Sequence, residues 1–302
     1  MTQLYSLLLK LEIIMKKLGL ATALVLAMTG AHAYQFEIQG QSEALDSNDE
    51  NRDFNNYTVG GQATYYFKNV DASKGPLAEA AFVNQASNVS LGYNFANLDE
   101  VKSQNVGVKA EAYVPTPYTP AYASLSYSAT DNDGKYGLND DRGQRWAVEF
   151  GSVIAPNFLV AVGYTNVVEQ TSLDTFKILN SGFAKAVGET ATIADDQDAI
   201  TARTKYVGAI DGTPMSIGFE TGLVYGEDTA YELKTDLYLN SQLSAGVSYA
   251  ESSFAGSPDS AWGVNVNYFI TPAIAVGASY LNANGVNAAD MQTVGLNAKV
   301  RF

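Results

Sequence analysis

Charged side chains of both signs recur at every second position in several segments of this 302-residue chain. Residues two apart on a β-strand share one face, so each such segment would carry a polar face with paired charges. Such a face can bind water, ions and polar solutes, and an Arg or Lys facing lipid instead costs about 2–4 kcal/mol at the midplane. The pattern therefore predicts the lining of a water-filled interior. The predicted lining residues are Glu37, Lys109, Glu111, Arg145, Glu149, Arg203, Lys205, Glu220, Lys234, Asp236, Lys299 and Arg301.

The residue inventory excludes most catalytic chemistry. The chain has no Cys, and its single His, His32, lies in a segment that we expect to be removed. Cys nucleophiles, Ser-His-Asp triads and metal sites built from His or Cys are therefore excluded from the mature chain. An Asp-rich run at 131–141 does not match a calcium loop, because Lys135 occupies a ligand position. We expect no catalytic, cofactor or metal site.

The amino terminus predicts export. From Met15 the chain reads Lys16-Lys17, an apolar run over 18–28 and a small-residue cleavage site ending at Ala33. The apolar run is shorter than the roughly 20 residues that a membrane-spanning helix needs. We expect 15–33 to be a signal peptide and 1–14 to be a mis-assigned upstream extension. Residues 34–302 would then form a single domain with 15 basic and 31 acidic residues, a balance that argues against a nucleic-acid partner.

Apolar residues occupy the other face of the same segments. Examples are Phe36 and Ile38, Trp146 and Phe150, and Val264. Segments of about 9–11 alternating residues are the length of transmembrane β-strands, and bacterial barrels usually have an even number. The sequence thus predicts an all-β, transmembrane, antiparallel up-and-down barrel of about 14 strands in contact with outer-membrane lipid. The predicted strands are 34–45, 56–67, 88–98, 104–114, 121–130, 144–154, 158–169, 198–210, 215–225, 231–239, 243–252, 261–269, 274–283 and 291–302.

The connections between these segments alternate in length. With both termini in the periplasm, most periplasmic connections are short turns, such as 115–120 and 155–157, and several outer connections are long and acidic, such as 46–55 and 131–143. The acidic runs can simply keep loops solvated, or they can attract cations and amino-bearing solutes to a pore mouth.

One connection on the periplasmic side is too long for a turn. Residues 68–87 follow the second strand, and unstructured connections of this length are uncommon and often functional. Three interpretations remain open: a plug or gate folded into the lumen, a turn resting beneath the barrel, or a missed pair of strands. The residues predicted to form the plug are Lys68, Asp71, Lys74, Gly75, Pro76, Glu79 and Phe82.

A second long connection contains helical periodicity. Residues 173–188 place Leu173, Phe176, Phe183 and Val187 on one stripe. The predicted helix could constrict the outer mouth, although packing on the barrel rim is the favoured alternative.

Four stretches together resemble Acinetobacter-type outer-membrane porins associated with carbapenem susceptibility. They are 15–30 (MKKLGLATALVLAMTG), 68–90 (KNVDASKGPLAEAAFVNQASNVS), 201–210 (TARTKYVGAI) and the carboxy-terminal region 265–302. The resemblance implies a monomeric fourteen-stranded barrel with a narrow pore, gated by the turn after the second strand, here 68–87. It also implies that Phe302 is the signal read by the barrel-assembly machinery.

These observations predict an outer-membrane porin for passive diffusion of small hydrophilic solutes. The acidic loops favour cationic or amino-bearing solutes, such as basic amino acids, and the resemblance adds carbapenem-type antibiotics. The alternative is a structural or adhesive barrel with little flux, which would share every fold feature.

Overall fold

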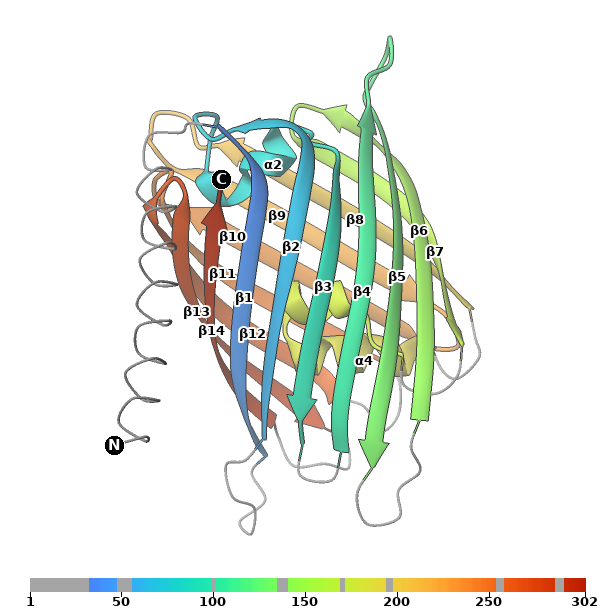
Figure 1. Ribbon diagram of the computed structural model, residues 1–302. Coiled ribbons are helices and arrows are strands. Elements are labelled where there is room, and N and C mark those ends of the chain that lie inside the picture. Colours follow the sequence, from blue (N-terminus) through green and yellow to red (C-terminus); the bar gives the residue numbers. More distant parts are fainter. Residues whose placement is uncertain are drawn as a thin grey trace, which may run out of the picture.

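Fourteen strands of the described residues form one closed barrel in the computed structural model (Figure 1). The structure describes residues 33–47, 56–98, 101–134, 141–168, 172–193, 198–253, 258–285 and 291–302. The strands are β1 Ala33–Ser47, β2 Asn56–Asp71, β3 Asn88–Asn97, β4 Val101–Val114, β5 Ala121–Gly134, β6 Asp141–Ala155, β7 Phe158–Val168, β8 Asp198–Ala209, β9 Ser216–Tyr225, β10 Thr229–Tyr238, β11 Leu243–Ser252, β12 Pro258–Thr271, β13 Ile274–Gly285 and β14 Met291–Arg301. The predicted fold class is confirmed.

The barrel closes where the first strand pairs with the last. β1 and β14 run antiparallel, with Glu37 opposite Arg301 and Ser47 opposite Met291. Closure pairs the backbone groups of every strand, which is what a sheet needs in lipid, where no water can satisfy a free edge. No helix among the described residues is long and apolar enough to cross a membrane.

The two-residue alternation separates an apolar outer surface from a polar interior. Phe36 and Ile38 are 44% and 50% exposed on the outside, whereas Glu37 between them is 7% exposed. Phe150, Val264 and the other predicted lipid-facing residues in the barrel wall follow the same rule, because side chains of a strand alternate in direction. The sequence pattern predicted this division correctly.

The connection after β2 lies at the terminal end of the barrel, meaning the end where Ala33 and Phe302 are found (Figure 1). β2 continues to Asp71, past the predicted end at 67, and pairs there with β1. A short 3-10 turn, η1 (Leu77–Glu79), and one turn of helix, α2 (Ala80–Val83), follow before β3. The possibility of a missed strand pair in 68–87 is therefore wrong.

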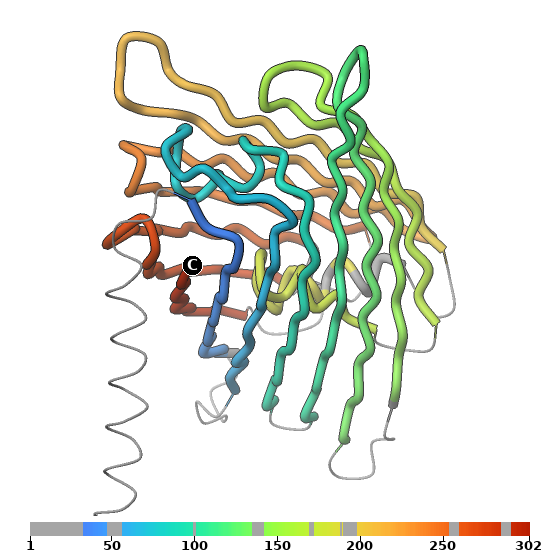
Figure 2. Tube along the Cα trace, turned by 45° about the horizontal axis from the view of Figure 1, so that its top comes forward, coloured from blue at the N-terminus to red at the C-terminus, as the bar shows by residue number. Residues whose placement is uncertain are grey.

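The connection after β7 enters the barrel. It forms α3 (Thr175–Ser181) and α4 (Phe183–Ile193), which lie inside the ring of strands (Figure 2). The Asp174 side chain caps α3 by accepting hydrogen bonds from the backbone N–H groups of Phe176 and Lys177. The predicted helix at 173–188 is thus two helices, and the favoured position on the rim is wrong.

The expected signal peptide, its cleavage site and the upstream extension lie outside the described residues, apart from Ala33. Most of the acidic loop residues between 46 and 55 and between 135 and 140 also lie outside them.

Candidate functional site

The interior at the terminal end is built on the seam between β1 and β14. Glu37 accepts a hydrogen bond from Arg301 Nε at 2.7 Å and lies 2.9 Å from Lys299 Nζ. The Arg301 guanidinium is sandwiched between the rings of Tyr34 and Phe269, at 4.7 and 4.6 Å from their centroids. Arg301 is 2% exposed, so this charge depends on Glu37 and on the two aromatic rings for its stabilisation.

Phe302 completes the same seam through its backbone. Its N–H donates to the carbonyl of Phe36, and its carbonyl accepts from the N–H groups of Gln35 and Phe36. The Phe302 ring stacks on Phe36 with centroids 5.4 Å apart. The last residue therefore ties β14 to β1 on the lipid-facing side.

Residues 72–87, hereafter the terminal segment, contact several walls of the lumen. Arg301 of β14 donates to the carbonyl of Leu77 at 2.8 Å, and the Leu77 N–H donates to the carbonyl of Ser241 after β10, also at 2.8 Å. Glu79 lies 3.0 Å from Lys205 Nζ of β8 and accepts a hydrogen bond from Tyr238 of β10. These contacts place the segment among inward-facing side chains from three parts of the barrel.

The apolar side chains of the terminal segment are buried against the same walls. Leu77, Ala80 and Ala86 form a cluster with aromatic residues that include Tyr66 and Phe269. Phe82 packs against a second cluster, which contains Tyr122, Val153, Leu159 and Ala161. Apolar packing is therefore the main interaction that keeps the terminal segment in place.

The other residues predicted for a plug lie closer to solvent. Lys68 is exposed, and Lys74, 64% exposed, pairs with Asp71 at 3.8 Å. Gly75 has φ +77°, a left-handed conformation that suits glycine, and buried Pro76 precedes η1. Of the predicted plug residues, Glu79 is the one that pairs with a charge of the lumen wall, Lys205.

The middle of the lumen carries a network on β4 to β9. Lys109 lies 3.1 Å from Glu111, which also accepts a hydrogen bond from Tyr122 at 2.8 Å. Arg203 makes two hydrogen bonds to Glu149, at 3.3 Å from Nε and 3.0 Å from Nη2. The structure thus brings five of the predicted lining residues together, with Glu220 as the fifth at 3.6 Å from Arg203.

Lys205, Lys234 and Asp236 continue this network. Lys205 lies 3.6 Å from Glu220, and Lys234 lies 3.3 Å from Asp236. Every basic residue of the predicted lining lies within 4.0 Å of an acid. Each cation of the lumen wall therefore lies beside an acid.

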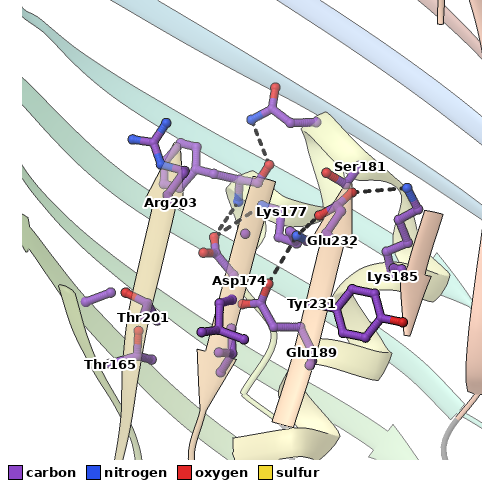
Figure 3. Close-up of a pocket in the computed structure, with 18 of the residues that line it drawn as sticks. Thr165, Asp174, Lys177, Ser181, Lys185, Glu189, Thr201, Arg203, Tyr231 and Glu232 are labelled. Atoms are coloured by element: carbon purple, nitrogen blue, oxygen red, sulfur yellow. Dashed lines mark hydrogen bonds and ion pairs between the residues drawn. The ribbon is translucent and has the colours of Figure 1, made fainter. Parts of the chain in front are cut away.

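The helices α3 and α4 are held in the lumen by buried ion pairs (Figure 3). Lys177 of α3 and Lys185 of α4 both pair with Glu232 of β10, and Lys185 lies 3.1 Å from it. Lys177 also lies 3.2 Å from Glu189. One acid of the barrel thus binds one cation from each helix.

Arg145 of β6 joins this network from the opposite side. It donates a hydrogen bond to Glu189, and its guanidinium lies 4.0 Å from Asp174. Burial by itself would raise the pKa of the Glu189 carboxyl, but Lys177 and Arg145 outweigh burial and hold that pKa below its usual range. Arg145, predicted to line the lumen, is 4% exposed where it meets Glu189 of α4.

Three glycines of neighbouring strands make room for α3. A Cβ built on Gly60 would lie 2.8 Å from Leu179, and one built on Gly107 would lie 2.9 Å from the Cβ of Thr175. Gly92, on the strand between them, is within 3.0 Å of Thr175 by the same construction. The inward faces of β2, β3 and β4 are thus flat where the helix packs.

Glu43 of β1 holds the junction between the helices. Its carboxylate accepts hydrogen bonds from the Phe183 N–H at 3.1 Å and from the Thr58 hydroxyl at 3.2 Å. Gln39 and Gln41 donate to the carbonyls of Leu179 and Ile178. We did not predict these contacts or the roles of Lys177 and Glu189. The signal that could have revealed them is the row of inward-facing glycines opposite an amphipathic helix.

A cavity of about 290 Å³ lies between α3–α4 and the wall formed by β4 to β12. Figure 3 shows that its labelled residues come from the helices and from the strands facing them. Its lining includes Lys109, Arg203, Glu220 and Lys234, together with the hydroxyl groups of Thr165 and Thr201. The interior is therefore divided into a terminal segment, a charged cavity and a pair of helices.

A closed barrel with an apolar outer surface and a charged lumen defines an outer-membrane channel. A family described as "Putative general bacterial porin" matches residues 9–302, and the chain belongs to this family of porins of the bacterial outer membrane. Family and fold point to a channel rather than an enzyme.

Solved structures agree with this assignment. The chain is 49% identical to the outer membrane protein Omp33 of Acinetobacter baumannii, with a TM-score of 0.68 over 90% of this chain and 99% of that one. The monoaromatic hydrocarbon channel CymD is 8% identical, with a TM-score of 0.51 over 89% of each chain, and shows likeness of fold alone. No curated protein matches the chain.

Proposed function

We propose that this porin passes small hydrophilic solutes by passive diffusion through a pore that the terminal segment closes at rest. The observation that carries this proposal is the position of Glu79, which lies in the lumen between Lys205 and Tyr238 at the terminal end. A segment placed there obstructs the route to the periplasm. The α3–α4 helices, which occupy part of the lumen, set the width of the remaining passage.

The proposed opening step is competition for Glu79. An ammonium group of a solute can replace Lys205 beside this carboxylate, and Lys205 then retains Glu220 at 3.6 Å. The terminal segment is then kept in place by a few hydrogen bonds and by apolar contacts. Release of the one ionic contact therefore favours an open segment.

We further propose a bias toward cationic or amino-bearing solutes, including basic amino acids and carbapenem-type antibiotics. Each predicted lumen cation already has an acid beside it, so we assign the bias to the acidic residues of the outer connections. Those among the described residues include Asp46, Asp131, Asp133, Glu227 and Asp228. Acids around a pore mouth raise the local concentration of cations.

Two further proposals concern assembly, and the first rests on Phe302. Its exposed ring and its backbone bonds to β1 suit recognition by the barrel-assembly machinery before the seam closes. We also propose that the barrel is monomeric. Size-exclusion chromatography with light scattering in detergent tests the second point, and a trimer mass would contradict it.

A hairpin replacement tests the gate. Phe67 N–H donates to the Ser87 carbonyl at 3.0 Å, so replacing 68–86 by Asn-Gly joins β2 to β3 by a standard two-residue turn. We expect a severalfold rise in single-channel conductance in planar bilayers, because the terminal segment is gone and the pairing of β2 with β3 is retained.

Residues 115–120 provide the matched control. They join Val114 to its partner Ala121 at the same end, so the same Asn-Gly replacement shortens a turn that makes no contact of the kind that Glu79 makes. Conductance of this control should equal that of the wild type. Equal conductance of the 68–86 replacement and the wild type would contradict the gate, and absence of current in both would favour a structural or adhesive barrel.

A second experiment tests the bias. Neutralising the five acids to Asn or Gln should move the zero-current potential in a salt gradient toward that of a non-selective pore, because mouth charges set the local cation concentration. An unchanged potential would refute the proposed role of the acidic connections.

A further inference from the structure

Two opposite charges face the central cavity side by side. Glu220 of β9 and Lys234 of β10 are direct partners in the antiparallel register. Each side chain is 35% exposed, compared with 21% for Arg203 and 19% for Glu149. Both residues line the cavity of about 290 Å³. These two are therefore the charges of the cavity wall that are most accessible to a solute.

Glu220 is held loosely by its neighbours. The nearest nitrogens of Arg203 and Lys205 are both 3.6 Å away, beyond the 2.7–3.2 Å of an N–H···O hydrogen bond. Each of these cations has a closer acid, because Arg203 donates twice to Glu149 and Lys205 lies 3.0 Å from Glu79. The Glu220 carboxylate thus retains acceptor capacity toward the cavity.

Lys234 has matching capacity as a donor. Its Nζ lies 3.3 Å from Asp236, and an ammonium group has three protons to donate. Directly opposite side chains of antiparallel strands have Cβ atoms about 4.5–5.5 Å apart. The wall therefore presents an acceptor of negative charge and a donor of positive charge next to each other.

We propose that Glu220 and Lys234 form a binding subsite for small zwitterions that carry an ammonium and a carboxylate on the same or adjacent carbon atoms. The solute lies antiparallel to the pair, with its ammonium at Glu220 and its carboxylate at Lys234. The cavity, at the small end of the roughly 300–1,000 Å³ of ligand pockets, admits a solute the size of an amino acid. This inference rests on the proposed function and names the solute class for it.

The charge balance of the wall favours a zwitterion over a singly charged solute. A lone cation at Glu220 also lies beside the Lys234 ammonium, and a lone anion at Lys234 lies beside the Glu220 carboxylate, so either one meets a like charge. A zwitterion supplies both partners at once. The lumen thereby selects for paired charges, independently of any attraction by the outer acids.

Saturation-transfer difference NMR on the full chain in detergent micelles tests the subsite. The probes are alanine and lactamide, which have nearly the same size, with and without charges. We expect saturation transfer to alanine to exceed that to lactamide about fivefold, because two partly exposed ion pairs strengthen the binding of alanine by about this factor. Ethylamine and propionate, which each carry one of the two charges, should fall between these limits.

The variants Glu220→Gln and Lys234→Gln should each reduce the preference for alanine by severalfold, and Lys102→Gln on the outer face should leave it unchanged. Equal signals from alanine and lactamide in the wild type, or an unchanged preference in both lumen variants, would overturn the proposal. If a variant does not fold, as judged by circular dichroism, the ethylamine and propionate comparison in the wild type decides.

Failure of this inference is distinguishable from failure of the proposed function. Binding is measured without flux, so a protein that prefers alanine but passes no solute into liposomes contradicts only the channel. A conducting protein without the preference contradicts only the subsite.

Discussion

The terminal segment and the α3–α4 helices both fill the lumen, but the barrel holds them in different ways. Among the described residues, the terminal segment has one lumen ion pair, Glu79 with Lys205, and is otherwise held by apolar packing and by hydrogen bonds, including those from Tyr238 and Arg301. The helices share a network of three cations and three acids. In addition, α3 packs on Gly60, Gly92 and Gly107, hereafter the glycine floor. A solute can replace Lys205 beside Glu79, whereas the ion pairs of the helices share partners with one another.

This difference separates a movable part from a fixed one. Removing one member of a buried ion pair leaves the other unpaired, at a cost of about 3–5 kcal/mol. Arg145 and Glu232 of the barrel each pair with two residues of the helical connection, so withdrawing α3–α4 would break these four contacts together. We therefore expect the terminal segment to open and the helices to stay.

The largest expected effect comes from locking each part with a disulfide. The Leu77 N–H bonds to the Ser241 carbonyl, and the Thr175 N–H bonds to the Ser128 hydroxyl, so both pairs are close enough to be cross-linked, and the chain has no Cys of its own. Oxidised Leu77→Cys/Ser241→Cys should conduct almost no current and should recover on reduction.

Oxidised Ser128→Cys/Thr175→Cys is the matched control and should conduct like the wild type in single-channel records. Loss of current in this second pair, with no change in the first, would reverse the assignment of the movable and fixed parts.

The next largest effect is on stability. Glu232→Gln removes the shared partner of Lys177 and Lys185, and we expect a loss of about 3 kcal/mol in the free energy of unfolding. Urea titration of the protein in lipid vesicles measures this loss. A loss below that of Glu79→Gln would contradict the idea that the helices are held more strongly than the terminal segment.

Adding a side chain to the glycine floor gives a smaller effect. Gly107→Val drives a methyl group into Thr175 and Phe176, and overpacking of this kind costs about 1–3 kcal/mol. Gly222→Ala is the control, because a Cβ there meets nothing within 4 Å. The same titration compares the two, and equal stabilities would show that α3 does not rest on the floor as described.

The smallest effect is expected for Glu79→Gln. The substitution removes the charge attraction to Lys205 but retains an oxygen that accepts from Tyr238. Loss of one partly exposed ion pair is worth about 1 kcal/mol, which corresponds to about a fivefold rise in the ratio of open to closed times. Single-channel dwell times measure this ratio. An unchanged ratio would mean that the apolar contacts alone hold the terminal segment.

Much of the fold was predictable because its signal is local. The alternation Phe36-Glu37-Ile38 already separates lipid face from lumen face, and the short turn at 155–157 separates two strands without reference to the rest of the chain. Errors in strand ends occurred where pairing extends beyond the pattern, as in β2, which continues to Asp71 by pairing with β1.

The site was predictable only as a set of inward-facing charges. Sequence placed Arg145 and Arg203 on the same polar face, but it could not show that Arg145 pairs with Glu189 of α4 while Arg203 pairs with Glu149 of β6. It also left open which charge of 68–87 meets the lumen wall, because the side of this segment that faces the barrel depends on the bend at Gly75-Pro76.

The order of amino acids is enough to predict the barrel, its strand count, the composition of its lumen and the unusual length of 68–87, since a two-residue period and a count of residues need no distant partner. Where the helices go and which charges meet depend on contacts between residues far apart in the chain. Gly60, Gly92 and Gly107 come from three strands and form a floor only in the closed register, and Glu232 meets Lys177 and Lys185 only after the chain has folded back into the barrel.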